Sequence, residues 1–151
     1  MTNEVDILLV DDSQDDVDLT LHALRSENLA NTVFVARDGE EALDFLFCSG
    51  PHAKRSFEHP PKLVLLDLKL PKVDGLEILK QIKTDEKYSM IPVVVLTSSH
   101  EEKDMVASYR LGVNAYVVKP VDFHEFVNAI KELGAFWAVI NEPPPGSVRK
   151  S

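Results

Sequence analysis

KLVLLDLKLPKVDG, residues 62–75, is the most informative segment of the chain. Four large apolar residues, Leu63 to Leu66, are followed directly by a carboxylate, Asp67. A short apolar run bounded by chain-breaking residues is typical of a strand buried in a parallel sheet. Pro71 then breaks the chain, and Asp74-Gly75 begins a predicted helix over residues 75–83. A carboxylate at such a strand end stands where open α/β sheets bind ligands, although an ordinary surface Asp can also end a strand.

The same pattern of a buried strand followed by a helix occurs along the whole chain. Four further strands are predicted over residues 5–10, 32–36, 93–96 and 115–118. Helices are expected after Ser13, Asp38, Ser98 and Asp122, each a residue type that caps helix N-termini. Gly112 suits the position just after the fourth helix. Five strands alternating with five helices predict one α/β domain whose parallel sheet has helices on both faces.

Two segments do not fit this alternation. The polar stretch between Phe47 and Leu63 is longer than a typical loop, which favours a mobile or partner-facing segment or, equally, a tolerated insertion. The last helix is predicted to run past Phe136, and a Pro-rich tail follows it from Glu142. We therefore predict a single domain over residues 1–141 and a disordered tail over residues 142–151.

Composition narrows the class of protein. The 151 residues carry a formal charge of −9, which argues against direct binding of nucleic acid. Cys48 is the single cysteine, so an internal disulfide is impossible and a reducing compartment is expected. The N-terminus lacks the basic start of a secretory signal, and the apolar runs are too short to span a bilayer. A cytoplasmic protein without membrane association is predicted.

Polar residues end four of the five predicted strands. Asp11 and Asp12 follow the first strand, Asp67 the third, Thr97 the fourth and Lys119 the fifth. The carboxyl ends of parallel strands meet at one edge of a sheet, so these side chains are expected to converge. Carboxylates held close together repel one another unless a cation binds, and oxygen ligands favour Mg²⁺.

The rest of this group favours phosphate chemistry. Lys119 supplies a cation and Thr97 a neutral hydroxyl, which suit a tetrahedral dianion. Asp67 can then act as a nucleophile toward a phosphoryl group. The histidines lack the spacing of metal ligands, and no Gly-rich nucleotide loop is present in the sequence.

Four ordered motifs, LLVDDS, LVLLDLKLPKVDG, VVVLTSS and AYVVKPVD, resemble the receiver domain of two-component response regulators. The resemblance implies a flavodoxin-like (βα)5 fold with strand order 2-1-3-4-5, the order of the chemotaxis receiver. It also implies that Asp67 is the phosphoacceptor for a histidine kinase. Asp12 would bind Mg²⁺ directly and Asp11 through water, with the backbone carbonyl of Lys69 as a further ligand. Lys119 would pair with the acyl phosphate, and the Lys119–Pro120 peptide bond would be cis.

Within receivers, the long segment before Leu63 and the extended C-terminal end resemble the group that works with cyanobacterial phytochromes. A phytochrome-type sensor kinase is thus the expected partner. The resemblance also implies a switch in which Thr97 moves toward the phosphoryl group and is coupled to Tyr116, changing the face formed by the fourth helix, fifth strand and fifth helix. Simple core packing of Tyr116 is the alternative.

The last helix carries more apolar residues than the sheet can cover. Phe126 can face the core, while Phe136, Trp137, Val139 and Ile140 extend the apolar surface. Such surfaces usually mark an interface. We predict a symmetric homodimer that uses Tyr109, Phe126, Phe136 and Trp137, and an unknown downstream protein that receives the signal. The alternative is that the extension folds back onto its own domain.

Two other functions remain open at this point. A haloacid-dehalogenase-like phosphatase also uses a strand-end Asp nucleophile, but it needs a second carboxylate two residues later, where this chain has Lys69. A degenerate receiver that serves only as a scaffold would not need the intact acidic residues and Lys119. The preferred interpretation is a stand-alone receiver, not a metabolic enzyme, that catalyses only its own phosphorylation and dephosphorylation.

Overall fold

The computed structural model describes residues 5–26, 32–54, 60–120, 122, 124–126 and 128. Within them, five parallel strands form one sheet in the order β2-β1-β3-β4-β5. The strands are β1 (Ile7–Val10), β2 (Val33–Ala36), β3 (Leu63–Leu66), β4 (Val93–Thr97) and β5 (Ala115–Val118). The predicted flavodoxin-like fold and its strand order are confirmed.

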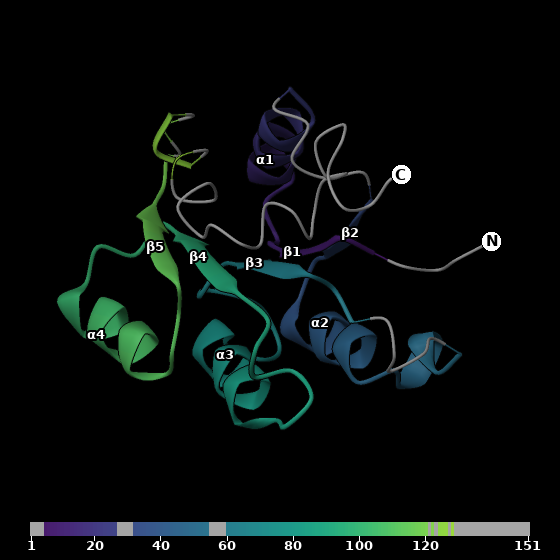
Figure 1. Ribbon diagram of the computed structural model, residues 1–151. Helices are drawn as coiled ribbons and strands as arrows, with labels where there is room; N and C mark the ends of the chain where they lie inside the picture. Colours follow the sequence, from purple (N-terminus) through teal and green to yellow (C-terminus); the bar gives the residue numbers. More distant parts are fainter. Residues whose placement is uncertain are drawn as a thin grey trace, which may run out of the picture.

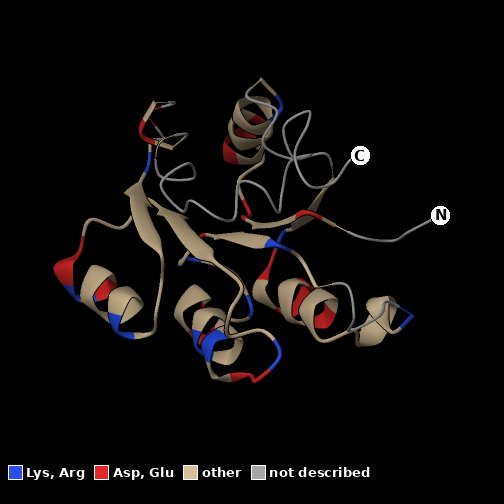
Figure 2. Ribbon diagram, viewed as in Figure 1, with Lys and Arg blue, Asp and Glu red and all other residues tan. Residues whose placement is uncertain are grey.

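Helices cover both faces of this sheet. α1 (Gln14–Ser26) lies on one face, and α2 (Gly39–Leu46), α3 (Gly75–Thr84) and α4 (Glu102–Arg110) lie on the other (Figure 1). Among the described residues, no helix combines the length and the apolar character needed to cross a membrane. Figure 2 shows Lys and Arg spread over helices and loops of the described part instead of gathered in one stripe.

The strand register explains why the acidic residues meet. Val10 is paired with Leu66 across β1 and β3, so the next residues, Asp11 and Asp67, leave the sheet side by side. The amide of Asp67 still donates to the carbonyl of Val10 at 3.0 Å. On the other side, Thr97 is paired with Val118, and Lys119 follows. The register therefore brings the strand ends to one edge, as predicted.

The apolar runs of the central strands form the core. All four residues of β1 and of β3 are buried, and alternate residues pack on opposite sides of the sheet. Leu8 and Leu66 pack with α2 and α3, whereas Ile7 and Leu65 pack with α1. Burying each such side chain contributes roughly 1.5–3 kcal/mol. This burial fixes the strands that carry Asp11 and Asp67.

The start of α4 differs from the prediction. Ser98 and Glu101 have the spacing of a capping box, but α4 begins at Glu102, with Glu101 as its N-cap residue and no side-chain cap bond from it. The physical reason is Ser99, whose hydroxyl accepts from the Glu101 amide at 3.2 Å and donates to Asp104 at 2.6 Å. The bond from Ser99 to Asp104, in the first turn of α4, places residues 98–100 before the helix. The predicted cap at Asp38 is confirmed, since it accepts from the Glu41 amide at 2.8 Å.

Part of the long segment before β3 is packed on the domain. A short 3-10 helix, η1 (Gly50–His52), places the His52 ring edge-on to Phe34 and Phe45, with centroids 5.1 and 5.2 Å apart. Phe34 and Phe45 stack on each other at 4.3 Å. Ser49 also donates to Asp44 at 3.0 Å. The described beginning of this segment is thus attached to β2 and α2, and residues 55–59 lie outside the described residues.

The C-terminal predictions fall mostly outside the described residues. Phe136, Trp137, the helix extension and the predicted tail over residues 142–151 all lie there. Before them, the Glu125 amide donates to Asp122 at 3.0 Å, which is the expected helix cap. Phe126 is fully buried against the core on the α1 side of the sheet. Its side chain is therefore covered by its own domain, in contrast to the exposed Tyr109, and its predicted place in a dimer interface stays a prediction.

Candidate functional site

The Lys119 ammonium joins the strand ends. Its Nζ atom lies 2.8 Å from Asp11 Oδ2, 3.0 Å from Asp67 Oδ2 and 2.8 Å from Asp16 Oδ2. The side chains of Lys119, Asp11 and Asp67 are 9%, 1% and 8% exposed, so these charges are largely removed from water. Asp16, from the first turn of α1, is 35% exposed. Residues far apart in sequence thus form one ionic centre.

Backbone amides orient the two buried carboxylates. Asp11 Oδ1 accepts from the Ser13 amide at 3.0 Å, and Asp67 Oδ1 accepts from the Lys69 amide at 3.2 Å. In both cases the amide lies two residues after the acid, in the turn that follows the strand. Each carboxylate is therefore held by one oxygen while its other oxygen faces Lys119.

Burial and ion pairing have opposite effects on the pKa values of the charged groups in this centre. Burial raises the pKa of Asp11, and the hydrogen bond from Lys119 only partly offsets it. Burial also disfavours the charge on Lys119, but its bonds to Asp11, Asp16 and Asp67 outweigh that effect and raise its pKa. Lys119 is accordingly a fixed cation at neutral pH.

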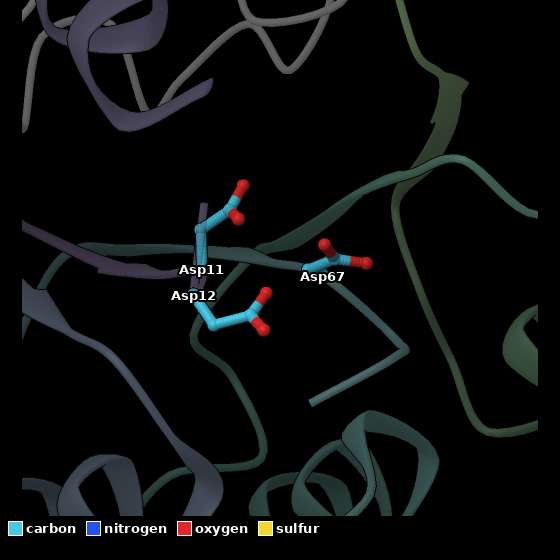
Figure 3. Close-up of side chains that lie close together, drawn as sticks. All are labelled: Asp11, Asp12 and Asp67. Atoms are coloured by element: carbon cyan, nitrogen blue, oxygen red, sulfur yellow. The ribbon is translucent and has the colours of Figure 1, made fainter. Parts of the chain in front are cut away.

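Asp12 completes a group of carboxylates suited to a metal ion. One oxygen from each of Asp11, Asp12 and Asp67 lies within 4.8 Å of the others, and Figure 3 shows the three side chains together at the ends of β1 and β3. Asp12 is exposed, so the group opens to solvent. A set made only of oxygen atoms, with one open side, fits a hard divalent cation that keeps several waters.

Thr97 and Tyr116 both contact Ser99. Thr97 is fully buried at the end of β4, and its Oγ1 accepts from the Ser99 amide at 3.3 Å. The Tyr116 hydroxyl donates to the Ser99 carbonyl at 3.2 Å. The two predicted switch residues are therefore linked through the backbone of one residue in the loop between β4 and α4.

A second ion pair lies beside this loop. Lys69 Nζ is 3.4 Å from Asp104 Oδ2, which also accepts from the Ser99 hydroxyl at 2.6 Å. The Ser99 bond and the nearby Lys69 ammonium lower the pKa of Asp104. Beyond the loop, the Lys119–Pro120 peptide bond is cis, the form that the resemblance implies.

Three residues of the site were not predicted from the sequence: Asp16, Ser99 and Asp104. The run of acids after β1 was a weak signal for Asp16, because position 16 lies one turn after Ser13. Nothing in the sequence distinguished Ser99 and Asp104 from ordinary residues at a strand end and in the first turn of a helix. Polar residues after a strand and acids in the first turn of a helix are common without any function.

The comparisons agree with this geometry. The profile of the response regulator receiver domain family matches residues 7–131. Response regulator Rcp1 of Synechocystis sp. is 40% identical over 131 residues, which are 87% of this chain and 87% of that protein. The family match spans every strand end of the ionic centre.

Solved structures give the same result. The bacteriophytochrome response regulator RtBRR has a TM-score of 0.81 and 58% identity, covering 95% of this chain and 86% of that one. The phosphorylated cyanobacterial phytochrome response regulator RcpA has a TM-score of 0.75 and 38% identity, covering 93% and 99%. The Mn(2+)-bound form of Rcp1 has a TM-score of 0.73 and 40% identity, covering 87% and 92%.

Proposed function

We propose that Asp67 takes a phosphoryl group from the histidine of a sensor kinase, because this chain belongs to the response regulator receiver domain family. The chain is a receiver-domain response regulator homologous to the phytochrome response regulators. The observation that carries the assignment is the Lys119 ammonium, bonded to Asp67 in a nearly buried ionic centre. An acid held beside a fixed cation is placed to bind and attack an anionic phosphoryl group.

The reaction needs little covalent chemistry from the protein. One Asp67 oxygen bonds to phosphorus as the bond between phosphorus and the donor imidazole nitrogen breaks, and the departing nitrogen takes up a proton. Lys119 offsets the added negative charge. The backbone amide of Lys69 donates a hydrogen bond to Asp67 Oδ1 and keeps the carboxylate turned toward the phosphoryl donor. Positioning and electrostatics therefore supply the catalysis.

We propose that Asp11, Asp12, Asp67 and the backbone carbonyl of Lys69 hold Mg²⁺. The three carboxylates within 4.8 Å of one another fit this ion, and the relative Rcp1 has a Mn(2+)-bound form. When bound, a divalent cation offsets the repulsion among these acids and the charge on the phosphoryl oxygens. Asp12, the exposed member, leaves the group open for exchange with solvent.

Thr97 and Lys119 are the proposed phosphate-binding groups, and Thr97 with Tyr116 the proposed switch. Because both switch residues bond to Ser99, a movement of the Thr97 hydroxyl toward a phosphoryl oxygen would disturb the Tyr116 bond as well. Tyr116 lies on β5 next to α4. Phosphorylation would in this way shift the population of conformations on that side of the domain.

The proposed partners are a phytochrome-type sensor kinase, a second copy of the chain and a downstream protein. The kinase follows from the relatives, which include phytochrome and bacteriophytochrome response regulators. Tyr109, 51% exposed on α4, together with Phe136 and Trp137, forms the proposed homodimer surface. The haloacid-dehalogenase alternative has no support from the comparisons, and Lys69 pairs with Asp104 instead of supplying an acid.

Incubation with Mg²⁺ and acetyl phosphate, followed by intact-mass measurement, tests the phosphoacceptor. The native chain should gain one phosphoryl group that hydroxylamine removes, and Asp67→Asn should gain none. Asp74→Asn is the matched control, because Asp74 is an exposed acid in the same loop. Persistence of the adduct in Asp67→Asn would refute the assignment. Transfer from a phosphorylated phytochrome-type kinase, compared with an unrelated kinase, tests the partner.

A further inference from the structure

The Lys69–Asp104 pair connects the loop after Asp67 to the first turn of α4. The Lys69 side chain is 57% exposed, whereas that of Asp104 is only 7% exposed. The partners differ in their freedom to move, because Lys69 has a flexible four-carbon stem and Asp104 sits on a helix. Of the two, Lys69 can change partner at little cost.

Asp104 is also attached to the proposed switch. The same oxygen that faces Lys69 accepts from the Ser99 hydroxyl at 2.6 Å, and the Ser99 backbone contacts both Thr97 and Tyr116. The Glu101 amide, at the N-cap of α4, donates to the Ser99 hydroxyl at 3.2 Å. A change at the Asp104 carboxylate would therefore alter the hydrogen bonds of Ser99 and of the N-cap residue of α4.

The Lys69 side chain starts at the reaction site. Its backbone amide lies 3.2 Å from Asp67 Oδ1, so this flexible side chain is attached directly beside the group that Asp67 would carry. A phosphoryl group carries close to two negative charges and three acceptor oxygens at neutral pH, against one charge on Asp104. The phosphoryl group is the stronger competitor for the ammonium.

We propose that Asp104 restrains the Lys69 ammonium: it binds the ammonium in the unphosphorylated protein and competes for it with the phosphoryl group, which takes the ammonium over when Asp67 is phosphorylated. The proposal rests on Asp67 being the phosphoacceptor. Once Lys69 leaves, Asp104 keeps only its bond to Ser99 within this group. The ion pair between the Asp67 loop and α4 is then broken. Phosphorylation can thus affect the helix through Lys69 and Asp104, in addition to Thr97 and Tyr116.

A double-mutant cycle tests this exchange. Phosphorylation by acetyl phosphate is measured against donor concentration for the native chain, Lys69→Gln, Asp104→Asn and the double variant. Lys69→Gln should raise the half-saturating concentration about two- to fivefold, as expected for a partly exposed ionic contact. Asp104→Asn should lower it, because the ammonium is freed for the donor. The double variant should match Lys69→Gln.

The opposite effects of Lys69→Gln and Asp104→Asn distinguish competition for the ammonium from a structural role of Asp104. If Asp104 only stabilised the fold, both substitutions would impair phosphorylation, and the effect of Asp104→Asn would persist in the Lys69→Gln background. Either result overturns the proposal. Lys69→Arg keeps the positive charge and should show the native half-saturating concentration. Lys103→Gln alters a 78% exposed lysine on α4 and should also leave that concentration unchanged. Thermal unfolding in EDTA checks that every variant is folded.

A spectroscopic readout does not depend on turnover. Beryllofluoride, which mimics a phosphoryl group on a carboxylate, should shift the Glu101 amide resonance in the native chain and shift it less in Lys69→Gln. An equal shift in both contradicts the exchange. The Asp67→Asn variant keeps the two proposals separable: an adduct that persists there refutes the phosphoacceptor, whereas an Asp67-dependent adduct without coupling in the cycle refutes only the role of Asp104.

Discussion

Lys119 Nζ lies 2.8 Å from Asp16 Oδ2, so a helix residue shares the cation that holds the strand-end acids together. The partners of this cation differ in burial: Asp16 is 35% exposed, whereas Asp11 is 1% exposed. An exposed carboxylate loses little when it is neutralised, since water already screens it. A buried carboxylate that loses its cationic neighbour bears the full cost of desolvation.

Lys119→Met should therefore destabilise the metal-free protein far more than Asp16→Asn. We expect a loss of about 3 kcal/mol for Lys119→Met, because Asp11 and Asp67 are left uncompensated, and less than about 1 kcal/mol for Asp16→Asn. Urea denaturation in EDTA measures both. Comparable losses in the two variants would show that burial does not decide the strength of these pairs.

Asp12→Asn should stabilise the metal-free protein and abolish its response to divalent cations. Asp12 adds a negative charge whose oxygen lies within 4.8 Å of those of Asp11 and Asp67. Removing this repulsion should raise the melting temperature in EDTA by about 1–3 °C. Adding Mg²⁺ should then raise it for the native chain but not for Asp12→Asn. Asp15→Asn, an exposed acid on α1, is the control and should keep the Mg²⁺ response.

The sequence was sufficient to predict the sheet and the meeting of Asp11, Asp67 and Lys119. Apolar runs bounded by breakers locate β3 and β5 to the residue, and parallel strands must place their carboxyl ends at one edge. The core position of Phe126 was less certain, because its helix carries apolar residues on more than one side.

The remaining site residues depend on tertiary contacts. An acid at position 16 serves an ordinary helix N-terminus equally well, and only the packing of α1 above the sheet brings it to Lys119. The start of α4 was misplaced because two local capping patterns compete there. Ser98 and Glu101 have the local spacing of a cap, but the bond from Ser99 to Asp104 determines where the helix begins.

Gly75→Ala should disrupt the turn that follows Asp67. A Cβ atom at position 75 would lie 2.4 Å from the Asp67 carbonyl oxygen and 2.5 Å from Leu68 Cα, both backbone atoms that cannot rotate away. Such overpacking costs about 1–3 kcal/mol. The displaced turn should also slow phosphorylation of Asp67. Glu77→Ala, an exposed change on the same helix, should do neither. Urea denaturation and the acetyl phosphate assay give both readouts.

Lys83 gives the protein a pH dependence at alkaline pH. Its Nζ atom donates to the carbonyls of Ile91 at 2.7 Å and Ser89 at 3.1 Å, and burial lowers its pKa from 10.5. Between the lowered pKa and 10.5, the unfolded chain binds more protons than the folded one, so raising the pH through this window adds stability.

The free energy of unfolding of the native chain should therefore rise relative to that of Lys83→Met as the pH increases toward 10.5. Urea denaturation at several pH values between neutrality and that limit measures the difference. Lys80→Met, at an exposed position of the same helix, serves as the control and corrects for general alkaline effects. A difference that stays constant or shrinks would show that Lys83 is not desolvated in solution.

Dimerisation should depend on the exposed apolar side chains of α4. Met105, Val106 and Tyr109 are 36%, 40% and 51% exposed, and a second copy would cover them together with Phe136 and Trp137. Light scattering at micromolar concentration should give a mass of roughly twice 16.9 kDa for the native chain. Tyr109→Asp and Phe136→Asp should each give the monomer, since a buried unpaired charge opposes association. Leu19→Asp alters a 58% exposed residue on α1, on the other side of the sheet from α4, and should remain dimeric. A native monomer would favour the alternative in which the C-terminal extension packs on its own domain.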